Sequence, residues 1–232
     1  MTGLEKAKEY LSKDFLTNCG LLQVINRSSA EIVQLDHNGV LLYDTISKTY
    51  MLGAEYGENI LKWFENLELD YIFITNNKFV PFLKERYGFK HDMKCYQYVY
   101  PGNSPIEYQK RLEVSSPTRE EMKIVKKNYK NLSENDLDEL NALGYLYAAH
   151  DSDGNMVGFV GSHFEGSMGL LEILPQYRRL GYGYELECFI INKFLEMGLI
   201  PYCQVKIRND KSKNLQSKLN MTKAPGQVDW LL

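Results

Sequence analysis

Pro175 to Gly183, PQYRRLGYG, separates a short apolar run from a helical one. The run before it, Met168 to Leu174, has the length and composition of a largely buried strand. After it, apolar residues recur at three- and four-residue steps between Leu186 and Met197, which predicts a helix from about Gly183 to Gly198. A strand therefore leads into a helix through a turn that contains two arginines and two glycines.

This turn has the chemistry of an anion-binding site. The first turn of a helix leaves N–H groups unpaired at the positive end of the helix dipole, which favours an anion such as phosphate. Gly181 and Gly183 let the backbone approach a ligand, and Arg178 and Arg179 add fork-shaped donors that suit phosphate oxygens. The alternative is that the glycines only permit a tight turn while both arginines are solvated.

The segments around the turn predict an α/β protein. Upstream, two β-rich runs within residues 145–163 are joined by Asp-Ser-Asp-Gly-Asn, which predicts a hairpin. Downstream, residues 202–208 alternate apolar and polar side chains as a strand does, and Asn209 can cap a last helix. Residues 111–115 are predicted to form a strand, and residues 119–129 and 134–143 two helices.

Three sequence blocks in this region resemble the GCN5-related N-acetyltransferase superfamily. RRLGYG, residues 178–183, fits the superfamily signature Gln/Arg-x-x-Gly-x-Gly/Ala at every fixed position. ILPQYR, residues 173–178, is similar to the Val-x-Pro-x-Tyr-Arg that precedes the signature, and residues 209–221 are similar to the Asn-x-x-Ser-x-x-Leu and Lys-Leu-Gly-Phe segments that follow it. LPQYR, together with Pro201-Tyr202, is most similar to the glycine N-acyltransferase (FR47-like) branch.

The resemblance implies a mixed, mostly antiparallel sheet flanked by helices, with acetyl-CoA as the co-substrate and no metal. It implies that the pyrophosphate is held by the backbone amides of Leu180, Gly181, Tyr182, Gly183 and Tyr184, between Arg178 and Arg179. It also implies that Leu171, Glu172 and Ile173 line the thioester where two strands splay apart, and that Asn209 and Ser212 contact the far side of the cofactor.

Two carboxylates compete for the role of general base, which deprotonates the attacking amine. Glu172 interrupts an apolar strand in phase with Met168 and Leu174, so we expect apolar neighbours to desolvate it and raise its pKa. The alternative for Glu172 is a structural pair with a buried cation. Glu165, in the preceding turn, is either the second candidate or a solvated turn residue; the glycine N-acyltransferase branch places its catalytic acid nearby, at the position that aligns with Ser167.

The general acid departs from the family pattern. Many members carry a tyrosine after the leucine of the last helix, which protonates the departing thiolate, and here that position is Gln216. Glutamine cannot give up a proton in this pH range. Either Tyr182, Tyr184 or Tyr202 supplies the proton, or the thiolate leaves unaided. His163 could act through water, although a lone histidine near a strand end is usually structural.

The amino-terminal half contains a weak copy of the same pattern. Residues 73–89 align with residues 205–221 at a constant offset, so that Asn77 corresponds to Asn209. The segment before this copy lacks an Arg-x-x-Gly-x-Gly motif. We therefore expect two tandem domains of the same fold, a degenerate one over residues 1–104 and an acyl-CoA-binding one over residues 105–232. The sequence leaves open whether the two halves pair within one chain or across a homodimer.

Composition limits the classes of partner and of site. A net charge of -3 and a pI near 5.9 leave no general positive potential, so we expect no nucleic-acid and no membrane partner. The first fifteen residues mix charges with apolar residues and resemble neither a signal peptide nor a membrane span, which favours the cytoplasm. The four cysteines are far apart, with no histidine at ligand spacing, so we expect no metal site, and Cys203 is expected to be a small buried hydrophobe.

These observations lead to one expected function and two alternatives. We expect an acyl-CoA-dependent N-acyltransferase, with acetyl-CoA as donor, that acts on the amine of a small molecule by direct transfer. The first alternative is a catalytically silent acyl-CoA sensor or interaction module, which Gln216 and the degenerate first half favour. The second is a nucleotide-binding protein that uses the same cradle. The acceptor is not identified, because the acidic run in residues 134–139 is typical of a solvated helix face.

Overall fold

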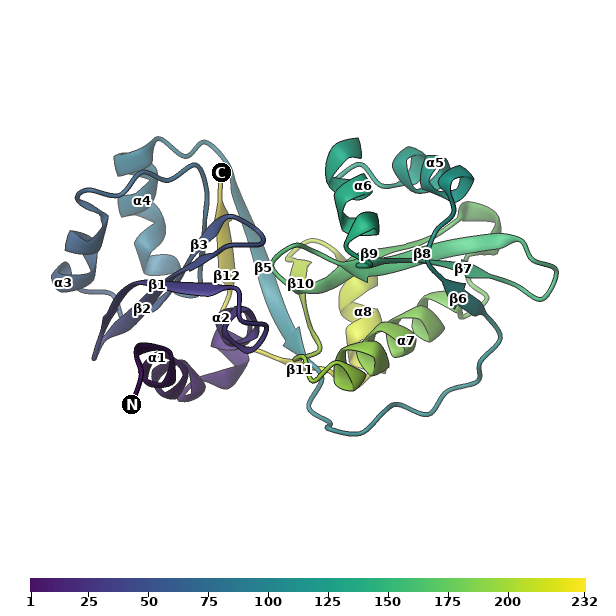
Figure 1. The fold of residues 1–232 in the computed structure, drawn as a ribbon, viewed down its shortest axis with the longest axis horizontal. Coiled ribbons are helices and arrows are strands. Elements are labelled where there is room, and N and C mark those ends of the chain that lie inside the picture. Colours follow the sequence, from purple (N-terminus) through teal and green to yellow (C-terminus); the bar gives the residue numbers. More distant parts are fainter.

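The computed structural model of the protein describes residues 1–232, which form two lobes along one long axis (Figure 1). Each lobe consists of strands covered by helices on both faces. The amino terminus lies at the outer side of the first lobe, and the carboxy terminus also lies in the first lobe, although the second lobe precedes it in the sequence. The chain therefore crosses back at its end.

The first lobe begins with two helices and continues with strands and shorter helices. A capping box starts the first helix, since Thr2 accepts from Glu5 N–H and the Glu5 carboxylate accepts from Thr2 N–H. The elements are α1 (Gly3–Ser12), α2 (Phe15–Asn26), β1 (Ala30–Asp36), β2 (Gly39–Asp44), β3 (Thr49–Ala54), α3 (Glu58–Leu61), β4 (Ile72–Ile74), α4 (Val80–Tyr87) and β5 (Asp92–Val99).

The elements of the second half of the chain follow the predicted order as far as α8, and two further strands come after it. The elements are β6 (Glu113–Ser115), α5 (Arg119–Asn128), α6 (Glu134–Ala142), β7 (Leu146–His150), β8 (Met156–Ser162), β9 (Met168–Ile173), α7 (Tyr182–Glu196), β10 (Tyr202–Lys206), α8 (Asp210–Lys218), β11 (Thr222–Lys223) and β12 (Val228–Leu231). The predicted hairpin, the strand before the glycine turn and the helix after it are confirmed within a few residues. Asn209 caps α8 as expected, because its side chain accepts from Ser212 N–H at 3.1 Å.

All twelve strands belong to one sheet, and the sheet confirms the mixed, mostly antiparallel architecture. Its order is β1-β2-β3-β4-β12-β5-β10-β9-β8-β7-β6, and β11 pairs with β5. Neighbouring strands are antiparallel except β3 with β4 and β9 with β10. Within each lobe, one parallel pair therefore lies among antiparallel strands.

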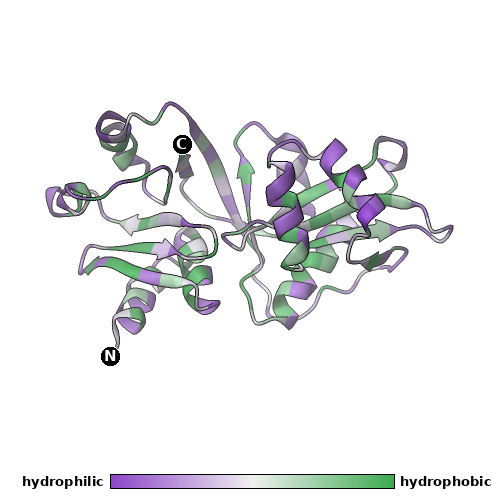
Figure 2. Ribbon diagram, turned by 45° about the horizontal axis from the view of Figure 1, so that its top comes forward, coloured by the Kyte–Doolittle hydropathy of each residue, from purple (hydrophilic) through white to green (hydrophobic).

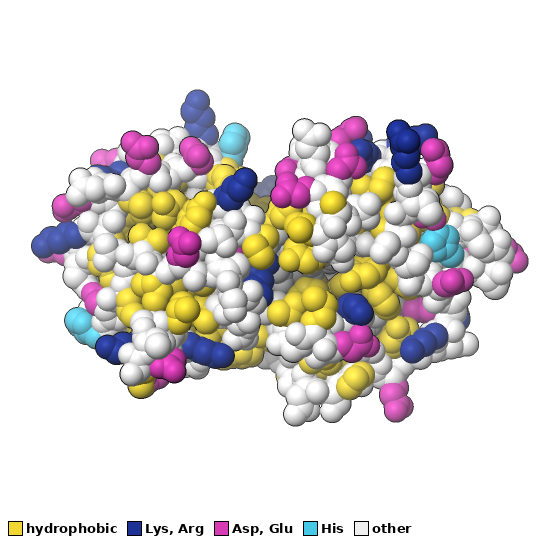
Figure 3. Space-filling model, viewed as in Figure 1, with side chains coloured by type: hydrophobic (Ala, Val, Ile, Leu, Met, Phe, Trp, Pro, Cys, Tyr) yellow, Lys and Arg dark blue, Asp and Glu magenta, His cyan; other side chains and the backbone are white.

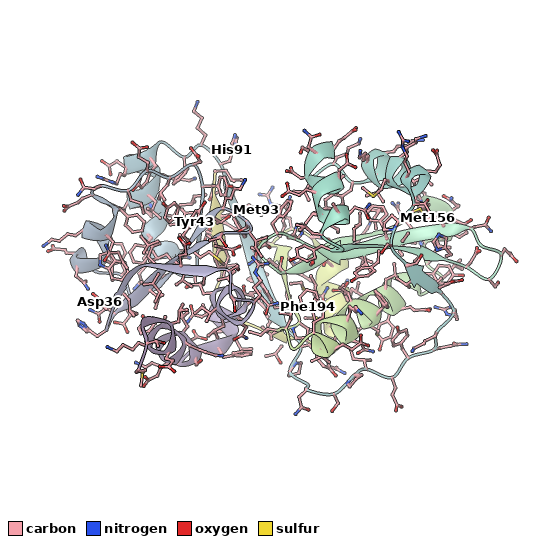
Figure 4. All side chains as sticks on the ribbon, in the orientation of Figure 1. Asp36, Tyr43, His91, Met93, Met156 and Phe194 are labelled. Atoms are coloured by element: carbon pink, nitrogen blue, oxygen red, sulfur yellow. The ribbon has the colours of Figure 1, made fainter.

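The two lobes exchange strands within a single chain. The last strand, β12, lies between β4 and β5, which both come from the first half. On its other edge, β5 pairs with β10 of the second half over the register Tyr202↔Val99 to Lys206↔Cys95. Met93 of β5, labelled in Figure 4, lies near this junction. A division of the sequence at residue 104 therefore does not separate the lobes in space, because the end of the second segment completes the sheet of the first.

Side chains from both segments share the cores. Val228 and Trp230 of β12 join the cluster beneath α1 and α2, and Leu231 joins the cluster beneath α4. Tyr98 of β5 joins the main cluster of the second lobe, beneath α7 and α8. Figure 2 shows that the hydrophobic residues follow the strands, as two-sided burial of a sheet requires. None of the helices has both the length and the apolar character that a membrane span needs.

Helix α2, which the sequence analysis did not predict, fixes the first lobe to the second. The Gln23 side chain donates to Gly166 O at 3.3 Å and accepts from Ile200 N–H at 2.9 Å. At the end of the same helix, Arg27 pairs with the buried Asp44 at 2.5 Å. The amphipathic signal of α2 is weak because most of its residues, polar ones included, are buried.

Candidate functional site

The quoted glycine turn lies where β9 and β10 separate. These two strands run parallel and pair only at Met168↔Cys203, near the start of both. Beyond that point β9 continues to Ile173 without a partner on this side, and α7 begins in the space beside it. The splay expected from the sequence resemblance is therefore present. It opens a cleft of about 400 Å³ next to the end of β9.

The cleft walls come from the glycine turn and from α8. They consist of Ile173, Tyr177, Arg178, Arg179, Gly181, Tyr182, Gly183, Tyr184, Leu215 and Lys218. Helix α7 has no side-chain cap, so the N–H groups of Tyr182 and Gly183 at its start point outward without a partner in the protein, whereas Tyr184 N–H donates to Gly181 O. Arg179 has a left-handed backbone with a φ of 66°, a strained conformation for a non-glycine residue that is common at ligand sites.

Glycine occurs at the two positions of the turn for different physical reasons. Gly181 has a φ of 87°, and a Cβ there would also lie 3.1 Å from the Arg111 guanidinium, so the fold itself requires glycine. Gly183 has no such restriction, because a Cβ there would meet only Ile173, at an ordinary 3.8 Å. The protein does not need glycine at position 183, so its missing side chain leaves room for a ligand. Two arginines, uncapped N–H groups and this space fit a pyrophosphate.

Some predicted cofactor residues lie outside the cleft. Leu171 packs on the main core of the second lobe, and Leu180 is exposed, with its carbonyl taken by Arg111. Asn209 and Ser212 form the cap of α8 and do not line the cleft. The sequence analysis missed Tyr177, Leu215 and Lys218; the last two are three residues apart, the spacing that marks one face of a helix.

Arg111 supports the turn from outside the sequence motif. It belongs to the segment that joins the two halves, and it donates to Leu180 O at 3.0 Å and to the Glu185 carboxylate at 3.1 Å. The buried Glu185 carboxylate also accepts from the N–H groups of Arg111 and Leu112 at 2.6 and 2.7 Å. The guanidinium lies 5.0 Å from the centre of the Tyr182 ring. The interlobe segment thus holds the start of α7 in place.

Glu172 does not have the environment that its sequence position suggested. A β-bulge opposite Val160 places Leu170 at a φ of 50° and turns the strand, so that Met168 and Leu170 pack in different cores. Glu172 then lies opposite Phe159, with 31% of its side chain exposed, and accepts from Arg178 at 2.8 Å. The expectation of an apolar pocket is therefore wrong, and so is the alternative of a buried cation, because Arg178 is exposed.

Glu165 is the buried carboxylate of the two candidates, so the alternative of a solvated turn residue is wrong. It is 7% exposed and accepts from Ser167, the residue aligned with the catalytic acid of the family branch, at 2.5 Å. Both Glu165 and Glu172 raise the pKa of Tyr129, after the larger effect of that tyrosine's own burial. Both carboxylates therefore lie within electrostatic range of Tyr129, the residue that follows α5.

The side chains considered as proton donors lie in different parts of the protein. Tyr182 and Tyr184 line the cleft, and the neighbouring Cys188 thiol raises the pKa of Tyr184. Tyr202 is completely buried between Cys19 and Val99, so it cannot reach a ligand in the cleft. The His163 ring packs directly over Gly169, where any side chain would collide with it, which is a structural role. Cys203 is buried as predicted, and burial raises the pKa of its thiol.

Gln216 holds a carboxylic acid that the sequence analysis did not single out. Gln216 is 1% exposed and donates from Nε2 to Glu187 of α7 at 3.1 Å, while its own Oε1 has no partner. Burial raises the pKa of Glu187 to about 7, so at and below this pH the group holds a proton. The protonated carboxyl group of Glu187 can donate a hydrogen bond to Gln216 Oε1. Glutamine at position 216 can therefore pair with Glu187 in its buried, uncharged form.

We expect Glu187→Gln to remove a pH dependence of stability. Burial raises the pKa of Glu187 in the folded protein, so the folded state binds this proton more tightly than the unfolded state does. The difference adds about 3 kcal/mol to the free energy of unfolding below about pH 4.5, and this added stability is lost as the pH rises to about 7. Glutamine keeps the shape and can still pair with Gln216. Urea unfolding across this pH range measures the difference between wild type and variant. Glu139→Gln, at an exposed carboxylate on α6, is the control, and equal pH slopes for wild type and Glu187→Gln would contradict the assignment.

Part of the chain is similar to a known protein family. Residues 146–231 match the model of the family described as FR47-like protein. No curated protein sequence matches the chain. The matched region reaches from β7 to β12, so its last strand is the one that lies in the first lobe.

Solved structures share the fold of the whole chain. A Drosophila protein has a TM-score of 0.68 at 13% identity, over 99% of this chain and 96% of its own. An acetyltransferase of the GNAT family from Colwellia psychrerythraea has a TM-score of 0.57 at 12% identity, over 100% and 98%. A GCN5-related N-acetyltransferase-like protein from Streptococcus suis has a TM-score of 0.54 at 14% identity, over 97% and 100%. These structures confirm the predicted fold, a mixed and mostly antiparallel sheet flanked by helices.

Proposed function

We propose that this protein is an acyl-CoA-dependent N-acyltransferase that transfers an acetyl group to the amine of a small molecule. The observation that carries the proposal is the cleft at the splay of β9 and β10, with its uncapped helix start, two arginines and a glycine at position 183 that the protein's own packing does not require. The match to the FR47-like family and the acetyltransferases among the similar folds support the same activity. When bound, acetyl-CoA supplies an activated thioester.

The cleft residues would hold the co-substrate through its phosphates. Tyr182 N–H and Gly183 N–H at the start of α7 would donate to its pyrophosphate, and Arg178 and Arg179 would balance the negative charge. Ile173, Tyr177 and Leu215 give the cleft an apolar wall suited to the uncharged pantetheine arm. The free edge of β9 beyond Met168 offers backbone groups beside that wall.

Glu172 is our first choice of general base. It follows Leu171 at the free end of β9 and lies on the face of the sheet that α5 and α6 cover, so an amine that enters from that side meets its carboxylate beside the cleft. Its ion pair with Arg178 orients the carboxylate. Glu165 is the second candidate, because it is buried and accepts from Ser167.

Tyr184 is the proposed proton donor to the departing thiolate. Its ring lines the cleft, and its pKa is raised, so the phenol is protonated at neutral pH. Gln216 cannot donate a proton and is itself engaged with Glu187. The tyrosine of α7 thus takes over the task that the family usually assigns to the last helix.

Two measurements separate this proposal from its alternatives. Isothermal titration of acetyl-CoA, ATP and NAD establishes which ligand binds, and a thiol-release assay with a panel of primary amines establishes turnover. We expect acetyl-CoA to bind, and at least one amine to be acetylated, with one free CoA released for each acetyl group transferred. Binding without thiol release from any amine would favour a silent sensor, and equal binding of ATP or NAD would favour a nucleotide-binding protein.

A further inference from the structure

A second cavity, of about 480 Å³, lies in the first lobe, away from the acetyl-CoA cleft. It opens at the carboxyl ends of β3 and β4, between Gly53–Glu55 and Thr75–Asn77. Asp36, labelled in Figure 4, marks the β1–β2 turn, and His37 of this turn lies on the rim. None of its lining residues belongs to the cleft between β9 and α7.

The cavity occupies the same topological place in its lobe as the cleft does in the other. β3 and β4 are the parallel pair of the first lobe, as β9 and β10 are of the second. In open α/β sheets, ligands bind in the crevice outside the carboxyl ends of parallel strands. Asn77 follows β4 at the position that the internal repeat aligns with Asn209 after β10. The first lobe has therefore kept the crevice and lost the glycine turn.

The wall of the cavity is polar, and much of it has no partner in the protein. Apart from Gly53, Ala54 and Gly226, every lining residue carries a polar side chain. The side chains of Thr17, Asn77 and Gln227 make no hydrogen bond within the chain, and Lys13 lies over the Tyr10 ring without a carboxylate partner. Such groups hold a ligand through hydrogen bonds and charge rather than through apolar contact.

The charged side chains of the wall disfavour a phosphate and favour a ligand that carries both a positive and a negative charge. Asp14 and Glu55 are carboxylates on the wall. Lys13 supplies one positive charge next to Asp14. A ligand with an ammonium and a carboxylate would satisfy both, whereas a phosphate would face two carboxylates.

We propose that this cavity is a second, non-catalytic site that binds a small zwitterion, a free amino acid or a dipeptide. The site joins the two halves, because Gly226 and Gln227 lie between β11 and β12 while Asp14, Thr17 and Asn18 lie at the start of α2. The other end of α2 contacts Gly166 through Gln23. A ligand there would stabilise the strand exchange, and the site needs neither acetyl-CoA nor turnover.

The test is isothermal titration of the full chain, without acetyl-CoA, with the free amino acids and a set of dipeptides. We expect at least one to bind with a dissociation constant below about 1 mM, and to raise the melting temperature when in excess. Lys13→Met and Glu55→Gln should each weaken that binding about tenfold or more, because each removes a charge-assisted hydrogen bond. Lys6→Met on α1 and Glu58→Gln on α3 are the matched controls, since both side chains lie outside the cavity.

Matched ligands test the chemical class. The decarboxylated amine and the deaminated acid of the best amino acid should each bind about tenfold more weakly or worse than the zwitterion. The proposal is overturned if no amino acid or dipeptide binds, if Lys13→Met and Glu55→Gln bind it as wild type does, or if either half-ligand or inorganic phosphate binds equally well. Because acetyl-CoA is absent, these outcomes are independent of whether the proposed acyltransferase activity is found.

Discussion

Gly183→Val is expected to weaken acetyl-CoA binding by about 100-fold or more while the protein stays folded. The valine side chain would meet only Ile173 of the protein at Cβ, at an ordinary contact distance, so the fold can accept it. Its two methyl groups would, however, occupy the cleft where the pyrophosphate meets the start of α7. Isothermal titration gives the change in affinity, and thermal unfolding checks the fold.

The matched control is Gly226→Val, a glycine outside the cleft with open space around it and no left-handed backbone. It should bind acetyl-CoA as wild type does. Gly181→Val is not a useful test, because a side chain there is strained by the left-handed backbone and by Arg111. If Gly183→Val binds acetyl-CoA with unchanged affinity, the glycine turn is only a turn and the proposed function loses its main support.

Glu172→Gln is expected to lower kcat about 100-fold, the usual scale for the loss of a general base. The exposed ion pair with Arg178 is lost too, but such pairs contribute little, so the dissociation constant for acetyl-CoA should change by less than about threefold. The thiol-release assay with the best amine gives kcat, and isothermal titration gives the dissociation constant.

Glu165→Gln is the companion variant, and Glu113→Gln, an exposed carboxylate of β6, is the control for a general loss of negative charge. If Glu172→Gln keeps the wild-type rate and Glu165→Gln loses it, the base is the buried carboxylate held by Ser167. If both keep the wild-type rate, neither carboxylate is the base, and the amine reaches the thioester already neutral.

The predicted elements that proved correct depend on short-range interactions. The hairpin at residues 151–155, the capping of α8 by Asn209 and the glycine turn before α7 are each decided by neighbours within a few residues. Asn220, at the position of the glycine in the Lys-Leu-Gly-Phe segment, has a left-handed backbone with a φ of 54°, which asparagine accepts more readily than most residues. Such features are visible in a single sequence because the residues that cause them are adjacent in it.

The face on which Glu172 lies illustrates what adjacent residues cannot decide. Strict alternation of side chains along β9 would place Glu172 on the same face as Met168. The alternation is broken because β9 has one extra residue opposite Val160 of β8. The bulge depends on the pairing of β9 with β8, so its position is fixed across the sheet rather than along the strand. The burial of Glu187 beneath Gln216 has the same origin, because α7 alone does not show which of its carboxylates will face α8.

By itself, the sequence determined the order of elements in the second lobe, the glycine turn before α7 and the resemblance to a family, because these depend on contiguous motifs and on the periodicity of each element. Only the tertiary structure decided that β12 completes the first lobe, that β5 joins the two, and that α2 fixes them together. Four residues of β12, one of them the buried Asp229, carry too little pattern to predict a strand. Their place is set by two partner strands more than a hundred residues away in sequence, whose edges only the folded chain brings together.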